Sequence, residues 1–493
     1  MAINAQTVTE TYVKRLTEVN SRSVVECRIQ GEDITEILAV SPQVALTSCE
    51  VSSGRINYGG RLICTAVYTG ANGLTRVQKG AEFTHYADGE GFAPAQTAVC
   101  SLSCEKVTVR RDGSAYVIAA VISAEIAVYG NAERAYLTGA DGAVCRSGDV
   151  TFINSVTFSG EGEVEDDFEA AAVSDILMHE ARAVVTDCKC GAGEIQVSGE
   201  IYLSMLALRS GEPASLDRVI PFSCEIACDE AAYTHKADCI AHITEAAVAA
   251  QVDEERARCN LRFTATLSFA GVFCELREAQ AVTDAFLTDG GCNLAFYTEN
   301  TPLRTETRVY SERVTGVCAS SSQIDFSCAL KAVTCPRAEC TYNPADGSLQ
   351  GAVSCILIYL KENELHASQL TLPFSLTLNG LTGQARIQAA VCGVSVRQRT
   401  EGECEGEATL KIAASAYQSK DVECVAEIER TDEKPADYPA VSVLFAGGGE
   451  TLWDVSKKLL RSPEDVSAAC SALTFPLKGG ERVVVYRAKT DTD

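Results

Sequence analysis

Apolar and polar residues alternate with a period of two along much of the chain. The alternation is clear around Gly60 and Gly199, where every second residue is apolar: Ile56, Tyr58, Leu62, Cys64, Ala66 and Tyr68 in the first run, and Ile195, Val197, Ile201, Leu203 and Met205 in the second. Successive side chains of a strand face opposite sides, so this period is typical of half-buried β-strands. Turn-forming sequences separate the runs, as at Ser52–Gly54, Gly191–Gly193 and Pro344–Gly347. The pattern therefore predicts a chain rich in strands.

Three stretches of the chain, which begin at Leu38, Leu177 and Leu330, share one pattern of spacings. In the first two, a glycine follows the leucine after twenty-two positions, and the third stretch is one residue shorter. A phenylalanine then follows the glycine at a spacing of 23 residues in all three, which gives the pairs Gly60 and Phe83, Gly199 and Phe222, and Gly351 and Phe374. Identical spacing in three copies indicates an internal repeat. A glycine on the apolar side of a strand predicts a bulge or a close approach of the backbone.

Each copy is followed by a second strand-rich region, and the repeat period is about 140–150 residues. We therefore expect a mainly β protein with tandem β-sandwich-like repeat domains and a small C-terminal βααβ domain. The expected borders are residues 1–158, 159–308 and 309–430 for three β domains, 431–439 for a linker and 440–490 for the small domain. Two polar stretches, Gly160–Ala171 and Glu429–Pro439, are interpreted as solvated connectors.

The C-terminal fifty residues have a different pattern, which predicts a strand at Val441–Phe445, a glycine turn, two helices and a strand at Arg482–Tyr486. Thr451 and Asp454 fit a capping box that begins the first helix, and Ser462, followed by a proline, fits the start of the second. Seven acidic and seven basic residues lie between positions 440 and 493, so this segment is electrostatically balanced.

The rest of the chain is acidic, and the formal net charge of the 493 residues is −25. This charge argues against nucleic acid or an anionic membrane as a partner, because phosphate groups would be repelled. The first residues lack the apolar run of an export signal, and no segment approaches 18 uninterrupted apolar residues. We therefore expect a cytoplasmic protein without membrane insertion. In that reducing compartment, the 23 cysteines are interpreted as small buried hydrophobic residues, and later oxidative cross-linking stays open.

Motifs for catalysis or for metal binding are not evident in the sequence. Zinc sites usually contain C-x2-C pairs, and none occurs; the five histidines are scattered. Cys188 and Cys190 share one side of a strand, which fits a metal or redox pair but also a plain buried pair. No nucleophile elbow and no phosphate-binding loop is present. We expect no catalytic residues, no metal and no cofactor, and hence a protein that is not an enzyme.

The C-terminal segment resembles a LysM domain. The sequence from Gly449 to Asp454, Gly-Glu-Thr-Leu-Trp-Asp, is similar to the family's Gly-Asp-Thr-Leu-Trp-Asp, and Pro476–Glu481 is similar to the turn before its last strand. LysM domains generally bind polymers of N-acetylglucosamine, and the resemblance implies a binding groove made of Gly449, Glu450, Thr451, Leu452, Trp453, Thr474, Phe475, Pro476 and Leu477. Because no export signal is visible, we expect a protein ligand there. Trp453 is either a binding anchor or part of the small core.

The three upstream repeats resemble the SPOCS domain of spore-coat-associated proteins from endospore-forming bacteria. The resemblance is carried by Leu38–Val44, by the strands around the shared glycines, and by the Pro-Phe-Ser sequences at Pro221–Ser223 and Pro373–Ser375. It implies a structural protein of the spore envelope in the mother cell, located at the forespore surface and in the spore coat. The implied partner is the morphogenetic ATPase of the coat basement layer. Two alternatives stay open: binding of cortex peptidoglycan through the LysM-like domain, and self-association into a surface layer or filament.

Overall fold

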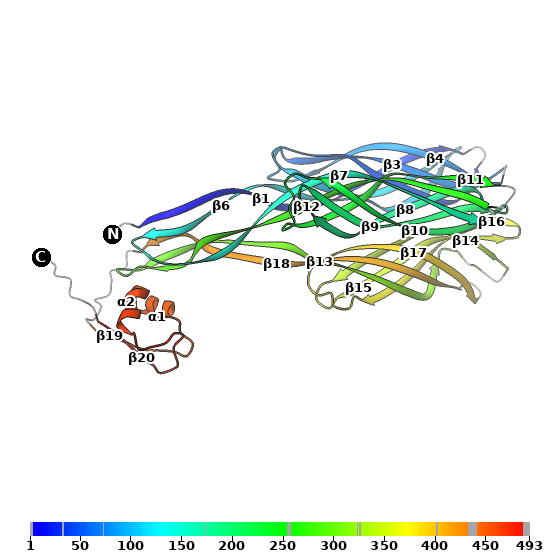
Figure 1. The fold of residues 1–493 in the computed structure, drawn as a ribbon. Coiled ribbons are helices and arrows are strands. Elements are labelled where there is room, and N and C mark those ends of the chain that lie inside the picture. Colours follow the sequence, from blue (N-terminus) through cyan, green and yellow to red (C-terminus); the bar gives the residue numbers. More distant parts are fainter. Residues whose placement is uncertain are drawn as a thin grey trace.

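The computed structural model describes residues 3–431, apart from 32–33, 72, 172, 254–257, 323, 325–326 and 401–402, together with residues 441–486. The molecule is elongated (Figure 1): most sheets gather at one end, and long paired strands run from them toward the C-terminal helices. Strands make up most of the described residues, and they form antiparallel sheets, so the prediction of a mainly β chain is confirmed.

Repeat 1 consists of six strands in two antiparallel sheets. The strands are β1 (Asn4–Gln30), β2 (Ile34–Ser52), β3 (Arg55–Gly70), β4 (Gly73–Asp88), β5 (Thr97–Asp112) and β6 (Ala115–Asp141). One sheet has the order β1-β6-β5 and the other β2-β3-β4. Both sheets contribute to one apolar core, in which Ile56 and Leu62 of β3 lie with Ile118 and Ile122 of β6. The alternating pattern of the sequence therefore marks the side of each strand that faces this core.

Repeats 2 and 3 follow the same order of strands. Repeat 2 contains β7 (Val144–Ala171), β8 (Val173–Cys190), β9 (Glu194–Arg209), β10 (Glu212–Ala227), β11 (Lys236–Asp253) and β12 (Arg258–Phe286). Repeat 3 contains β13 (Cys292–Ser320), β14 (Ala329–Asn343), β15 (Ser348–Lys361), β16 (Glu364–Thr377), β17 (Ala385–Thr400) and β18 (Glu403–Arg430). In repeat 3 a short pairing of β13 with β16 joins the two sheets into one. The borders expected after residues 158 and 308 fall within β7 and β13.

The acidic stretch Gly160–Ala171 is not a connector. It forms the second half of β7 and pairs with β12 along its whole length. Its acidic side chains mostly face outward, whereas Val164 is buried in the core and Gly160 and Gly162 lie close against side chains of β10. The interpretation as a solvated connector is wrong here, because the acidic residues alternate with Gly160, Gly162, Val164 and Phe168 on the inward side, as in a half-buried strand. Of the second stretch, Glu429–Pro439, most residues lie outside the described part of the chain.

The shared glycine and the shared phenylalanine of each repeat lie opposite each other on neighbouring strands. The register pairs Gly60 with Phe83, Gly199 with Phe222 and Gly351 with Phe374. A Cβ atom on Gly199 would lie 2.2 Å from the carbonyl oxygen of Val184 and 2.6 Å from Cζ of Phe222. The ring thus covers the glycine, and the neighbouring backbone leaves no room for a side chain. The predicted close approach of the backbone is confirmed, and it explains why the spacing is constant.

The three repeats pack around a common axis and form one body. Val67, Leu206 and Ile358 each stand seven residues after the shared glycine, and all three are fully buried in a single cluster. Leu38 and Leu177, with which the first two repeated stretches begin, belong to the same cluster. Equivalent positions of three repeats therefore meet at one place, so the arrangement is pseudo-threefold rather than a string of separate domains.

Three arms extend from this body (Figure 1). Each arm is the outer part of the long strand pair that begins and ends a repeat, namely β1 with β6, β7 with β12, and β13 with β18. The arms pack on one another through a cluster that includes Tyr136 of repeat 1, Phe152 of repeat 2 and Cys424 of repeat 3. The hydroxyl groups of Tyr12 and Tyr297 are hydrogen-bonded at 2.8 Å, which joins the first arm to the third.

Arg134 of β6 is the residue at which the three arms meet. Its guanidinium donates to the carbonyl oxygen of Ile153 on β7 at 3.2 Å and lies 3.8 Å from the centre of the Tyr12 ring on β1. It also forms ion pairs with Glu10 at 3.8 Å and with Glu299 on β13 at 4.0 Å. The side chains of Arg134 and Glu299 are 3% and 6% exposed. One buried cation therefore contacts all three repeats.

Replacing Arg134 with methionine is expected to lower the free energy of unfolding by about 3 kcal/mol, because the change leaves Glu299 buried without its counter-ion. Arg22→Met is the matched control, since the Arg22 side chain is 74% exposed where it pairs with Glu105, and such surface pairs contribute less than about 1 kcal/mol. Urea unfolding followed by circular dichroism measures both. A loss for Arg134→Met no larger than for Arg22→Met would contradict this role of Arg134.

The C-terminal module, residues 441–486, contains β19 (Val441–Phe445), α1 (Leu452–Leu459), α2 (Pro463–Ala469) and β20 (Arg482–Tyr486). β19 and β20 pair antiparallel, and the helices lie between them in the sequence. Thr451 and Asp454 form the predicted capping box of α1, and the Ser462 side chain accepts the Asp465 amide at the start of α2. Val455 of α1 belongs to the apolar core of the module. The predicted β-α-α-β order and both predicted caps are present.

Candidate functional site

The two loops expected to form a binding groove lie side by side in the C-terminal module. The amide of Gly449 donates to the carbonyl of Leu477, and the amide of Leu477 donates to the carbonyl of Glu450, both at 2.8 Å. The Thr451 hydroxyl accepts the Asp454 amide at 3.2 Å, which fixes the first loop to the start of α1. These hydrogen bonds make the two loops one continuous surface.

The expected groove residues differ in how far they reach the solvent. Four of them are exposed, namely Gly449, Thr451, Thr474 and Pro476, and three are half-buried, namely Glu450, Leu452 and Phe475. Leu477 is buried in the core of the module. All nine expected residues lie in the two loops and the first turn of α1. The side chain of the ninth, Trp453, faces away from the loops.

Trp453 packs against the arm of repeat 2. Its Nε1 donates to Oδ2 of Asp284 at 2.8 Å, and its ring meets Phe286 edge-on, with 5.2 Å between the ring centres. The guanidinium of Arg146 lies 5.4 Å from the centre of the indole. The Trp453 side chain is 9% exposed, and other residues, such as Val455, fill the core of the module. The indole therefore packs between the module and the arm of the same chain and is not part of the module's small core. Its role as an anchor for a partner stays a prediction.

Asp284 is the acceptor that holds the module to the arm. Its Oδ1 accepts the Lys457 ammonium at 2.7 Å, while its Oδ2 accepts the indole of Trp453. Burial alone would raise the pKa of Asp284, but the hydrogen bonds from Lys457 and Trp453 outweigh burial and lower the pKa below its ordinary value. A lowered pKa means that the contact is fully formed above the ordinary carboxyl pKa and is lost as the pH falls through the lowered one. The contact is therefore at full strength at neutral pH.

An apolar strip on β19 and β20 was not predicted as a site. It consists of Val441, Val443, Phe445 and Tyr486, which are 44%, 50%, 70% and 72% exposed. Tyr486 lies opposite Val441, so the four side chains share one face of the two-stranded sheet. The alternation of residues 441–445 was visible in the sequence, but alternation does not reveal which side packs on the helices. In the structure that side carries Leu444.

All cysteines of the chain are free thiols, and each is buried or half-buried, in line with their interpretation as small buried residues. Cys188 and Cys190 are both buried in β8. The thiol of Cys188 is hydrogen-bonded to that of Cys239 on β11, and in repeat 1 the thiols of Cys49 and Cys100 are bonded in the same way, so each pair links the two sheets of its repeat. Within the described part of the chain, no three His, Cys, Asp or Glu side chains are grouped closely enough to hold a metal ion.

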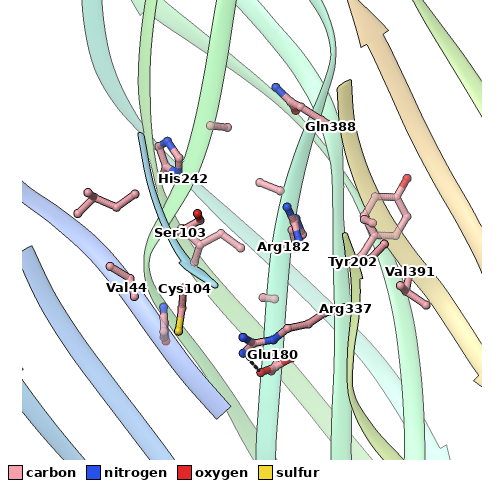
Figure 2. A pocket seen from close by; sticks show the side chains of 18 of the residues that line it. Val44, Ser103, Cys104, Glu180, Arg182, Tyr202, His242, Arg337, Gln388 and Val391 are labelled. Carbon is pink, nitrogen blue, oxygen red and sulfur yellow. Dashed lines mark hydrogen bonds and ion pairs between the residues drawn. The ribbon is translucent and has the colours of Figure 1, made fainter. Parts of the chain in front are cut away.

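A cavity of about 400 Å³ lies where the three repeats meet (Figure 2). Equivalent positions of the three repeats line it, namely Gln43, Arg182 and Arg337. Each stands three residues before the residue that pairs with the shared glycine on the preceding strand, which is Leu46, Val185 or Cys340. Arg337 is ion-paired with Glu180 at 2.7 Å, and the nearby carboxylate raises the pKa of Arg337. Sequence reasoning missed this site because its residues come from three repeats and no local motif joins them.

In the described ranges, no helix is both long enough and apolar enough to cross a membrane. Comparison with known proteins gives no relative: no family model, no curated protein and no solved structure matches the chain.

Proposed function

We propose that this chain is a non-enzymatic assembly protein of the bacterial spore envelope, which acts in coat morphogenesis and binds a partner protein through its C-terminal module. The proposal rests on the resemblance of the repeats to SPOCS domains and of Gly449–Asp454 to the LysM motif. Three such repeats followed by one such module resemble the clostridial spore morphogenetic protein SipL. By this resemblance the partner is the ATPase of the coat basement layer, and the place of action is the mother-cell side of the forespore surface.

The placement of the C-terminal module is the observation that carries the proposal. Asp284 and Trp453 fix the module to an arm, away from the gathered sheets of the body (Figure 1). The apolar strip and most of the loop residues stay exposed in this position. A rigid, elongated body that presents one small binding module is suited to holding a partner at a set distance.

The surface of the module favours a protein over a sugar as its ligand. The indole that could stack on a sugar ring is turned toward the arm and bonded to Asp284. The apolar strip instead offers Phe445 and Tyr486, two large exposed aromatic side chains of the kind enriched in protein interfaces. The acidic and basic residues of this segment are equal in number, so the module adds no strong repulsion of its own toward a charged partner.

The double variant Phe445→Ser, Tyr486→Ser is expected to weaken binding of the purified coat-basement ATPase at least tenfold, because loss of interface aromatic residues commonly costs about 2 kcal/mol. Tyr233→Ser is the matched control, since this tyrosine is 80% exposed but lies in repeat 2. Isothermal titration calorimetry measures the affinity. Equal affinity of the double variant and the control would exclude the strip as the binding surface.

Sedimentation with purified peptidoglycan is the second part of this experiment. The proposal predicts that the full chain binds the ATPase and stays in the supernatant with peptidoglycan. Binding to peptidoglycan without binding to the ATPase would contradict the proposal and favour a cortex-binding protein.

A further inference from the structure

The three arginines that line the central cavity differ in how their charge is balanced. Arg337 is paired with Glu180, and Arg386 is paired with Asp238, each at 2.7 Å. Arg182 has neither a hydrogen bond nor an ion pair to any residue that the structure describes. The cavity thus contains one guanidinium, that of Arg182, which no carboxylate of the described residues contacts directly, although Glu125 also lines the cavity.

Arg182 lines the cavity, and its side chain is exposed there. The surrounding protein lowers its pKa, first through desolvation and second through the charge of Arg337. The carboxylates of Glu180 and Glu339 act in the opposite direction but do not outweigh these two effects. A ligand of opposite charge that contacts Arg182 would offset both effects.

His242 of β11 lines the same cavity, and the charges of Arg182 and Arg386 act on it. Desolvation, followed by the charges of Arg182 and Arg386, lowers the pKa of His242 to about 4. Its Nε2 has no hydrogen-bond partner among the described residues. Figure 2 shows Arg182 between His242 and the Glu180–Arg337 pair. Arg182 and the Nε2 atom of His242 therefore lie at the cavity without a hydrogen-bond partner among the described residues.

We propose that the central cavity binds a small organic anion whose phosphate or carboxylate group pairs with Arg182. The volume of about 400 Å³ lies within the range of about 300–1,000 Å³ that is usual for small-molecule sites. Ser103 supplies a hydroxyl at the wall, and Gln388 supplies a side-chain amide whose oxygen is held by the Val185 amide at 3.0 Å. Apolar side chains such as Val391 cover the remaining wall and suit the uncharged part of the ligand.

This inference does not depend on the proposed partner of the C-terminal module, because the cavity belongs to the three repeats. An anion that contacts side chains of β5, β8 and β17 would hold all three repeats together, and its binding energy would add to the stability of the body.

Inorganic phosphate is the probe for the experiment, with sodium chloride of equal ionic strength as the baseline. Phosphate at saturating concentration is expected to raise the melting temperature of the wild-type chain by about 2 °C or more. The same rise is expected for Arg110→Gln. This is the matched control, because the Arg110 side chain is 61% exposed, forms an ion pair with Glu26 and does not line the cavity. Arg182→Gln should show no rise. An equal rise in all three proteins, or no rise in the wild type, would overturn the proposal.

Two further readouts separate a binding role of Arg182 from a structural one. Without phosphate, Arg182→Gln should be at least as stable as the wild type, because the change removes a charge that no partner balances. In the wild type, phosphate should raise the pKa of His242 measured by NMR, since the bound anion offsets the nearby arginines. A strongly destabilised Arg182→Gln, or a His242 pKa that phosphate leaves unchanged, would count against the anion site.

Discussion

Replacement of Gly199 with alanine is expected to lower the free energy of unfolding by about 3 kcal/mol. The added Cβ would lie 2.2 Å from the carbonyl oxygen of Val184 and 2.6 Å from Cζ of Phe222, so the backbone and the ring must both move. Overpacking of a well-packed core typically costs about 1–3 kcal/mol, and a displaced backbone places this variant at the upper end. Urea unfolding followed by circular dichroism measures the loss.

Gly80→Ala is the matched control for this variant. Gly80 also lies within a strand, but the atom nearest to its added Cβ would be 3.7 Å away, which is ordinary contact. Its stability should therefore stay within about 0.5 kcal/mol of the wild type. If both alanine variants lose the same amount, the close contact of glycine with phenylalanine is not what constrains the repeat.

Asp284→Ala is expected to release the C-terminal module from its arm. The change removes the acceptors of both Trp453 and Lys457, and the loss of these two hydrogen bonds should weaken docking by about 2 kcal/mol or more, which is roughly a 30-fold shift in the docking equilibrium. Trp453 is the one tryptophan of the chain, so its fluorescence reports the contact directly. Its emission should move to longer wavelength as the indole gains contact with water.

The control for this experiment is Glu278→Ala, which changes an exposed acid on the same strand, β12, and should leave the emission unchanged. In the wild type the emission should stay constant from neutral pH down to about pH 4 and should shift only below it, because the pKa of Asp284 is lowered by its partners. A shift that begins well above pH 4, or an Asp284→Ala variant with unchanged emission, would contradict the docking contact.

The predictable parts of the fold are those that a pattern of residues close in the sequence indicates. Gly199 and Phe222 reveal the repeat because register and turn length fix their separation. Thr451 and Asp454 reveal the start of α1 because a capping box needs only residues close in sequence. Alternation indicates strands, but it does not give their length. β7 therefore continues through Gly160–Ala171, although the acidic residues of that stretch are typical of a connector.

The arms were not predictable, because alternation gives neither the length of a strand nor its partners, and the arms pack through apolar clusters made of residues from all three repeats. Arg134 contacts Tyr12, Ile153 and Glu299. Nothing near it in the sequence indicates these partners. The candidate sites show the same limit. The LysM-like motif located the loops, but the partner of Trp453 lies 169 positions away along the chain, at Asp284. The cavity is formed by residues from three repeats. Arg182 differs from Arg337 and Arg386 only in that it has no ion pair, and the sequence does not show this difference.

The central claim is that three repeats and a docked C-terminal module form one elongated body, and small-angle X-ray scattering of the full chain in dilute solution tests it most directly. One body gives a curve that a single rigid, elongated particle fits, with the same dimensions across protein concentrations. A curve that requires an ensemble of separately moving repeats would contradict it.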